Sequence, residues 1–355
     1  MNIKTQNTLL QKLNYSRILQ ISFLIFIIEF VVILLLANRT EILKTFSIIF
    51  ISIILEAMPF ILLGTLLSGI IETFVSKDQM LRIFPKNSLI TILIAAGFGL
   101  IFPVCECAIV PVVRRLLKKG ISIGGAIAFL LGGPIVNSTV IFSTLFAYNF
   151  SWQIPLIRLL LGYSVASTIG ILIHFIFKNK NILINKKQDH ESDLDHGSHD
   201  NTHGDHDQDQ IHNGKQKATF LQKMKQAVSH ANNEFFDIVK FFIIGAFIAS
   251  ILQTVIPRVI IVSFARIPFL SILVMMLMAI LLNLCSEADA FIAASFNNSG
   301  ISIYAQMAFM VLGPMFDVKL LLMYFGVFKK RLIITLSISV IILVFISIII
   351  LRSIY

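Results

Sequence analysis

The chain has 355 residues, of which 57% are hydrophobic and only 14% are charged, and its mean hydropathy is +0.87. Soluble globular domains carry roughly 25% charged residues, so the composition excludes a soluble protein and indicates a multi-pass protein of the cytoplasmic membrane. The formal net charge of +10 comes mostly from Lys and Arg in segments between apolar runs, where such residues set the topology. No nucleic-acid-binding signature accompanies this charge, so we expect the lipid bilayer and not nucleic acid as a partner.

The first apolar run, about residues 18–37, follows a basic stretch that contains Lys4, Lys12 and Arg17. Its apolar core is long for a signal peptide, and no small-residue cleavage site follows it. We therefore interpret residues 1–43 as an N-terminal transmembrane anchor.

Two membrane regions follow, residues 44–177 and residues 234–355, and a polar segment at 178–233 separates them. Its low hydrophobicity and high charge predict a disordered loop. Six of the eight histidines of the chain lie between residues 190 and 212 of this segment, and His-rich tracts bind metal ions through many weak contacts. The alternative is a solvated linker without a metal-binding role. The candidate metal ligands are His190, His196, His199, His203, His206 and His212.

The two membrane regions resemble each other residue by residue. GISIGGAIAFLLGGP (120–134) and GISIYAQMAFMVLGP (300–314) share eight of fifteen positions at a constant offset of 180, where about one or two identities would be expected from ordinary composition. The same offset relates Cys105 to Cys285 and Asn137 to Asp317. We infer that the two regions are duplicated repeats.

The positions of the basic segments predict the topology of the first repeat. The loop with Lys77, Arg82 and Lys86 and the segment RRLLKK (114–119) are both expected inside. The apolar segment between them therefore enters and leaves on the same side, as a re-entrant hairpin over about 88–113 with PVCEC at its tip. The expected crossings are about 45–72, 121–148 and 154–177.

The second repeat starts inside and therefore has the inverted orientation. Its expected crossings are about 235–256, 303–328 and 331–351, with a hairpin over about 268–296 and NLCSEAD at the tip. The fold prediction is an all-α polytopic membrane protein, made of inverted repeats of three spans plus a re-entrant hairpin each, with an extra N-terminal transmembrane helix. The histidine loop is expected on the cytoplasmic side.

Inverted repeats with interrupted helices commonly place a binding site near the bilayer midplane. Gly-Pro pairs interrupt the long spans at 133–134 and 313–314, and a polar residue follows three positions after each proline. Non-helical backbone at membrane depth needs protein or a wet cavity around it, so each break is a candidate part of a binding site. The alternative interpretation of each break is a kink that serves helix packing. The candidate substrate-binding residues at the tips and breaks are Cys105, Glu106, Cys107, Gly133, Pro134, Asn137, Cys285, Glu287, Asp289, Gly313, Pro314 and Asp317.

The thiols suggest the chemistry of the ligand. In an extended tip, Cys105 and Cys107 would point the same way, and thiolates favour soft or borderline centres such as zinc and trivalent arsenic. The alternatives are inert packing of the thiols and a structural ion pair between Lys319 and Asp317. Glu56 and Asp237 occupy matching positions in the first helix of each repeat, where a buried carboxylate would serve proton coupling; a wet position at the membrane boundary is the alternative for Asp237.

Four motifs carry a family resemblance: PVCECAIVPVVRR, LLGGPIVNSTVIF, LCSEADAF and LGPMFDVK. They resemble the predicted-permease family that includes the organoarsenical efflux permeases, over nearly the whole chain apart from the first span and the histidine loop. The resemblance implies a transporter, carried by Cys105, Cys107 and the two Gly-Pro breaks. The chain departs from the arsenical exporters at Glu106, at the acidic SEAD tip and in the histidine loop, and is more similar to a branch paired with a small second membrane subunit.

Together these features predict a permease that exports a thiophilic substrate, either a trivalent organoarsenical or a divalent metal such as zinc. No nucleotide-binding motif is present, so an ion gradient or a partner would supply the energy. We expect no enzymatic activity and no resident cofactor unless it is zinc, and a second membrane subunit or a homodimer as protein partner. The alternative is a subunit of a membrane complex with a metal-dependent catalytic role or a scaffold role.

Overall fold

The computed structural model describes residues 39–74, 85, 87–101, 104–177, 182–183, 220–255 and 270–354. The predicted anchor run at 18–37 and the six loop histidines lie outside these residues. Within them the structure is helical, apart from turns and an isolated β-bridge between Leu183 and Phe328. The helices are α2 (Arg39–Phe74), α4 (Ser88–Gly97), η1 (Phe98–Leu100), α5 (Glu106–Lys118), α6 (Ile123–Gly132), α7 (Ser138–Ala147), α8 (Gln153–Phe177), α9 (Phe220–Val255), α11 (Leu270–Leu282), α12 (Asp289–Ser295), η2 (Phe296–Ser299), α13 (Ile303–Leu312), α14 (Val318–Val327) and α15 (Lys330–Ile354).

Four of the described helices are long and apolar enough to cross a membrane, because a bilayer core about 30 Å thick needs roughly 20 helical residues. The chain is therefore a polytopic helical membrane protein. The four spans are Ile42–Phe74, Gln153–Phe177, Met224–Val255 and Lys330–Ile354.

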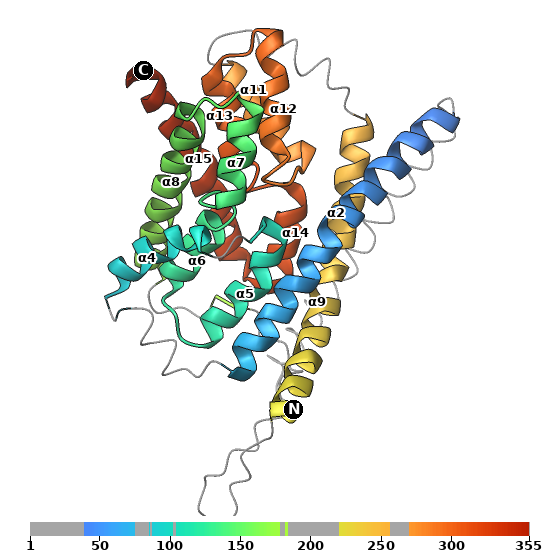
Figure 1. Cartoon of the computed structure of the whole chain (residues 1–355), viewed down its shortest axis with the longest axis vertical. Coiled ribbons are helices and arrows are strands. Elements are labelled where there is room, and N and C mark those ends of the chain that lie inside the picture. Colours follow the sequence, from blue (N-terminus) through green and yellow to red (C-terminus); the bar gives the residue numbers. More distant parts are fainter. Residues whose placement is uncertain are drawn as a thin grey trace, which may run out of the picture.

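Helices α2 and α9 pack along each other at one side of the bundle, while α8 and α15 lie at the opposite side (Figure 1). Small residues permit the close approach of α2 to its neighbours. A Cβ atom at Gly69 would lie 2.3 Å from the carbonyl oxygen of Ala227 in α9, and one at Gly64 would lie 2.4 Å from that of Ala108 in α5. Glycine at these positions brings backbones together, as is common between membrane helices.

The remaining helices have 13 residues or fewer, too short to cross a bilayer alone. Helices α4, α5 and α6 lie toward one end of the bundle, and α11, α12 and α13 lie toward the other end (Figure 1). Two non-helical connections lie between them, one before α5 and one after α11, and we call residues 104–107 and 283–288 the first and second interior turns. Residues 104–107 are buried, as are Asn283, Cys285 and Ser286, while the rest of the second turn is half-buried.

The two Gly-Pro sequences coincide with helix interruptions. Helix α6 ends at Gly132 and α7 begins at Ser138, while α13 ends at Leu312 and α14 begins at Val318. Proline supplies no N–H and disfavours continuation of the preceding helix, and the polar residue three positions later caps the next helix. Asn137 Oδ1 accepts from the amide of Thr139 at 3.0 Å, and Asp317 Oδ1 accepts from the amide of Leu320 at 2.7 Å.

Two expected boundaries differ from the structure. Helix α9 begins at Phe220, so its first turns occupy part of the range 178–233 that the composition assigns to the loop. The expected boundary at about residue 113 is also exceeded, because α5 continues through the basic segment RRLLKK to Lys118. Arg114 and Arg115 are buried there by partners from α2 and α9, which local composition does not reveal.

Candidate functional site

The two interior turns each contact a helix of the other half of the chain. Helix α5, which follows the first turn, packs against α14, and α12, which follows the second turn, packs against α7. Since α7 and α14 begin immediately after the Gly-Pro interruptions, each turn lies beside the capped start of a helix from the other half. The predicted site residues from residues 105–137 and 285–317 are therefore brought into one region.

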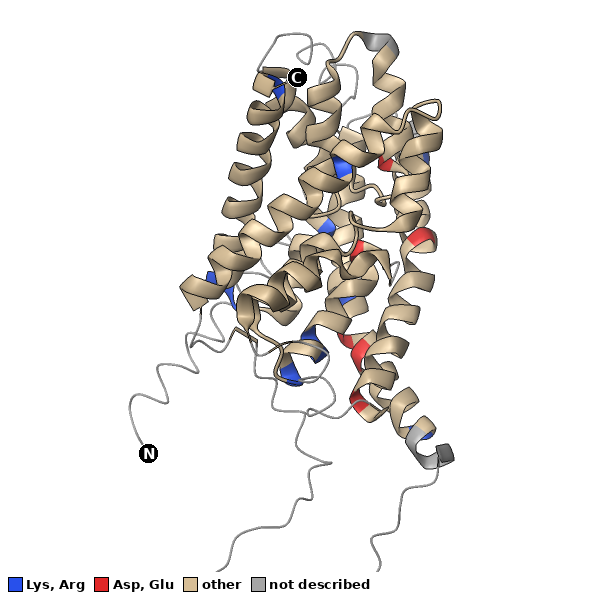
Figure 2. Ribbon diagram, turned by 60° about the vertical axis from the view of Figure 1, so that its left-hand side comes forward, with Lys and Arg blue, Asp and Glu red and all other residues tan. Residues whose placement is uncertain are grey.

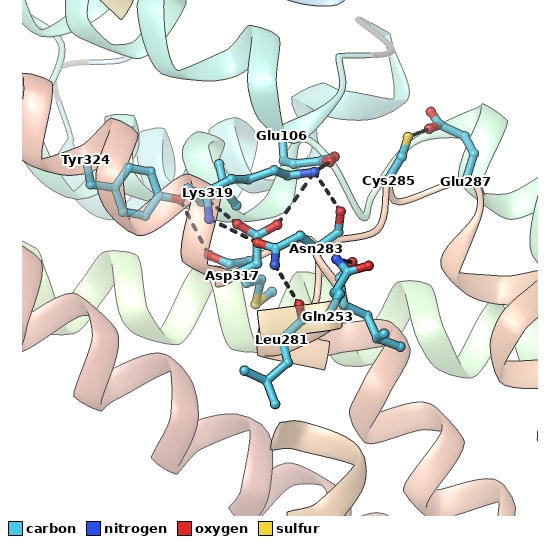
Figure 3. Close-up of polar contacts among 12 residues, drawn as sticks. Glu106, Gln253, Leu281, Asn283, Cys285, Glu287, Asp317, Lys319 and Tyr324 are labelled. Atoms are coloured by element: carbon cyan, nitrogen blue, oxygen red, sulfur yellow. Dashed lines mark hydrogen bonds and ion pairs between the residues drawn. The ribbon is translucent and has the colours of Figure 1, made fainter. Parts of the chain in front are cut away.

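Lys319 lies at the centre of the first of these contacts (Figure 3). Its Nζ atom lies 3.0 Å from Glu106 Oε1, 3.3 Å from the main-chain oxygen of Asn283 and 3.6 Å from Asp317 Oδ2. The lysine and both carboxylates are buried. The expected pair of Lys319 with Asp317 is present, but the closer carboxylate is that of Glu106 from the other half of the chain.

Asn283 contacts both the main chain and the side chain of Lys319. Its side-chain oxygen accepts a hydrogen bond from the main-chain N–H of Lys319 at 3.0 Å, and its side-chain amide donates to the carbonyl of Leu281 at 2.7 Å. The residue has φ of 48°, in the left-handed region that asparagine tolerates better than most residues. This conformation directs the Asn283 carbonyl toward the ammonium group.

The second contact has a different chemistry. The Cys285 thiol donates to Glu287 Oε2, and the Thr139 hydroxyl lies 3.3 Å from Glu287 Oε1 and 2.9 Å from Asn137 Oδ1. Glu287 is only half-buried and Thr139 is exposed, so this side of the region opens to the surroundings. Cys285 and Glu287 lie to one side of the Lys319 cluster (Figure 3).

All three thiols are free and buried. The expectation that Cys105 and Cys107 project together from an extended tip is wrong, because the helix begins at Glu106 with Cys105 as its N-cap residue. In consequence the two thiols do not project in parallel, because residues two apart at the start of a helix point in different directions. Among the described residues, no three His, Cys, Asp or Glu side chains form a group that could hold a metal ion.

Arg158 is a buried residue that the sequence reading missed. It lies in α8 and holds the second turn through Asp289, whose Oδ2 atom accepts from a guanidinium nitrogen at 2.8 Å. The same guanidinium donates to Thr144 Oγ1 at 2.9 Å and to the carbonyl oxygens of Ser286 and Met310, each at 3.1 Å. A lone arginine inside the apolar run 154–177 was the available signal, since such residues are rare and usually paired in membranes.

A second ion-pair network, also missed, lies where α5 ends. Glu234 of α9 is buried and accepts from Ser68 Oγ at 2.6 Å and from Arg115 Nε at 3.1 Å. Glu72 of α2 lies 3.6 Å from both Arg115 and Lys119. The charged residues gathered at this end of the bundle, and the few inside it, are visible in Figure 2. The network ties α2, α5 and α9 together.

The two predicted coupling residues do not lie in the central region. Glu56 is exposed on α2, and Asp237 of α9 pairs with Lys240 at 3.2 Å, with 26% of its side chain exposed. The four residues of the Gly-Pro breaks are buried. A Cβ atom at Gly133 would lie 2.4 Å from Ile109 Cδ1, so glycine there lets α5 pack against the first break.

Comparison with known proteins identifies the family. The profile of a family described as a predicted permease matches residues 42–352. The chain belongs to this predicted permease family. It is 40% identical over 296 residues to the UPF0718 protein YcgR of Bacillus subtilis, covering 83% of this chain and 93% of that protein.

Other relatives support the same assignment. A Streptococcus mutans protein named as a putative two-component membrane permease complex subunit is 40% identical over 285 residues, covering 80% of this chain and 87% of the relative. The UPF0718 protein YraQ of Escherichia coli is 29% identical over 112 residues, 31% of this chain and 32% of YraQ. No solved structure matches the chain. The resemblance seen in the sequence motifs is thus confirmed at the level of the family.

Proposed function

We propose that the chain is a secondary transporter of the cytoplasmic membrane, built from two inverted repeats that each contain a re-entrant hairpin. The order of long, paired short and interrupted helices is the same in α2–α8 and α9–α15. The observation that carries the proposal is the reciprocal contact of each interior turn with the helix start of the other half. Interrupted helices that meet at the repeat interface are the arrangement that transporters use for binding.

The proposed cargo is thiophilic, either a trivalent organoarsenical or a divalent metal such as zinc, and the proposed direction is export. Cys285, Glu287 and Cys105 supply soft and anionic groups beside the side of the region that opens outward. Because these groups are not assembled as a metal site, we infer that the cargo would draw them together on binding. The twelve candidate residues of the tips and breaks remain our proposed binding set.

Transport into proteoliposomes tests this proposal, with zinc and methylarsenite assayed in parallel. Cys105→Ser and Cys107→Ser should each abolish transport, because a hydroxyl replaces a thiolate poorly toward a soft centre. Glu287→Gln should weaken transport by removing a charge beside the cargo. Each variant is first compared with the parent protein by thermal unfolding, so that loss of fold is separated from loss of activity. Full activity for both substrates in the double Cys-to-Ser variant would eliminate the thiol hypothesis.

The topology part of the proposal places the histidine loop and the end of α5 in the cytoplasm. An Asp200→Cys substitution in a cysteine-free background should resist an impermeant thiol reagent in intact cells and react after permeabilisation. Deletion of residues 190–212 should lower transport only at scarce substrate, since a tract of weak sites concentrates ions without forming the transport site. Reaction of the introduced thiol in intact cells would reverse the orientation and with it the export direction.

A second candidate function is a subunit of a two-component membrane complex. The name of the Streptococcus mutans relative is the observation that favours it. Under this proposal a tagged chain purified in mild detergent brings down a second membrane protein at fixed stoichiometry, and reconstituted transport needs both. Transport by the chain alone would reject the requirement.

A further inference from the structure

The Lys319 ammonium occupies a position surrounded by oxygen atoms. Two carboxylates and a main-chain carbonyl lie within 3.6 Å of it, and Asn283 fixes the lysine through both its side chain and its carbonyl. Helix α9 also restrains the backbone, since a Cβ atom at Gly245 would lie 3.0 Å from the Lys319 Cα. The ammonium is thus held in a defined place by three separate elements.

The oxygen atoms around Lys319 can accept more hydrogen bonds than its one ammonium group donates to them. Glu106 Oε2 and Asp317 Oδ2 are buried and make no hydrogen bond, although a carboxylate oxygen can accept two. Asp317 already caps α14 through its other oxygen, so capping does not require its charge. With both acids ionised, the cluster of Glu106, Asp317 and Lys319 has a formal charge of −1, and buried charge without compensation is costly in a membrane.

We propose that Glu106, Asp317 and Asn283 form a binding site for a hard cation, and that Lys319 occupies it as an internal counter-ion. Carboxylate and carbonyl oxygens are the donors that sodium-like and magnesium-like cations prefer. The site shares Glu106 and Asp317 with the proposed cargo-binding set, but it does not include the thiol of Cys285, and its ligand is a hard cation. On the proposed transport function, Lys319 cancels one of the two negative charges of the empty site, a role that a bound coupling ion would otherwise fill.

The test removes the counter-ion and asks whether a free cation replaces it. The variant Lys319→Gln is purified in detergent and unfolded thermally at fixed pH and ionic strength, in choline chloride, sodium chloride or magnesium chloride. We expect a lowered midpoint in choline and a saturable recovery of about 5 °C or more with sodium or magnesium, because a ligand that binds the folded state stabilises it. The parent protein and Lys225→Gln, which removes an exposed lysine of α9, should respond to neither cation.

The double variant Glu106→Gln/Lys319→Gln completes the test. It removes one carboxylate together with the lysine, so its midpoint should return toward that of the parent and the response to cations should disappear. The proposal is contradicted if Lys319→Gln responds to sodium and magnesium no more than Lys225→Gln does, or if the response persists in the double variant. If Lys319→Gln aggregates in choline, recovery of folded protein only with sodium or magnesium supports the site, and recovery in none of the three contradicts it.

These measurements use no zinc, no arsenical and no transport. A protein that moves neither substrate but shows the cation response would reject the proposed cargo and retain the cation site. A protein that transports either substrate while Lys319→Gln ignores both cations would retain the function and reject the counter-ion.

Discussion

The molecule buries two basic residues beside its interior turns, and the two are surrounded in different ways. Arg158 meets a single carboxylate, that of Asp289, and places its other hydrogen bonds on a hydroxyl and on two main-chain carbonyls. Lys319 meets two carboxylates. Both clusters leave a carboxylate oxygen without a hydrogen bond, Asp289 Oδ1 in the first and Glu106 Oε2 and Asp317 Oδ2 in the second, so what distinguishes them is formal charge. The first pair has a formal charge of zero, whereas the second cluster retains a charge of −1.

This difference separates a structural pair from a site that can accept a ligand. Arg158 joins α8 to the second turn, α7 and α13, and the pair that it forms with Asp289 has no net charge. Lys319 joins α14 to the first turn but undercompensates the acids around it. Burial of a charged pair is therefore no evidence of function by itself; the formal charge of the whole cluster is the informative quantity.

The largest expected effect comes from removing Arg158. Arg158→Met should lower the stability of the folded protein by about 3–5 kcal/mol, because it leaves the Asp289 carboxylate buried and uncompensated. Thermal unfolding in detergent measures the loss. The double variant Arg158→Met/Asp289→Asn should recover much of it, since a neutral amide remains. A double variant as unstable as the single one would mean that the guanidinium acts mainly through Ser286 and Met310.

A smaller effect is expected at Gly64, which sets the position of the helix that carries Glu106. Gly64→Ala should cost about 1–3 kcal/mol through overpacking, because its Cβ would lie 2.4 Å from the carbonyl oxygen of Ala108. Gly97→Ala is the matched control, since the nearest atom there is Tyr163 Cε2 at 3.7 Å. Thermal unfolding of the two variants should separate them; equal midpoints would show that α2 and α5 adjust freely.

Asp317→Asn tests whether the charge of the Lys319 cluster matters more than its shape. Asparagine caps a helix as well as aspartate does, so stability should change by less than about 1 kcal/mol, while the cluster becomes formally neutral like that of Arg158. Loss of an electrostatic contribution near 1.4 kcal/mol would weaken cargo affinity roughly tenfold. Concentration series of zinc and methylarsenite transport provide the measurement. Unchanged affinity with unchanged stability would place Asp317 outside the binding region.

The interruptions and caps were predictable from sequence because their causes are local. Proline breaks the helix by removing an N–H, and Asn137 and Asp317 follow each break at capping distance. The partners of Lys319 and Arg158 were not predictable in this way. Glu106 lies 213 residues from Lys319, and Asp289 lies 131 residues from Arg158, so only the packed fold brings them together. Local reasoning also misjudged PVCEC, since nothing in these five residues distinguishes an extended tip from the first turn of α5.

The smallest effects are expected at Glu56 and Asp237, the acids that sequence position alone favours for coupling. Glu56 is exposed on α2, and Asp237 makes a surface ion pair with Lys240, a type of interaction usually worth about 0–1 kcal/mol. Glu56→Gln and Asp237→Asn should therefore leave the unfolding midpoint and the transport rate close to those of the parent. Transport driven by an imposed pH gradient is the decisive assay. If the substituted acid were a coupling residue, the variant would fold normally but its transport would no longer respond to that gradient. If either variant abolishes the gradient response while Lys319→Gln retains it, coupling lies on the α2–α9 side and the Lys319 cluster serves the cargo alone.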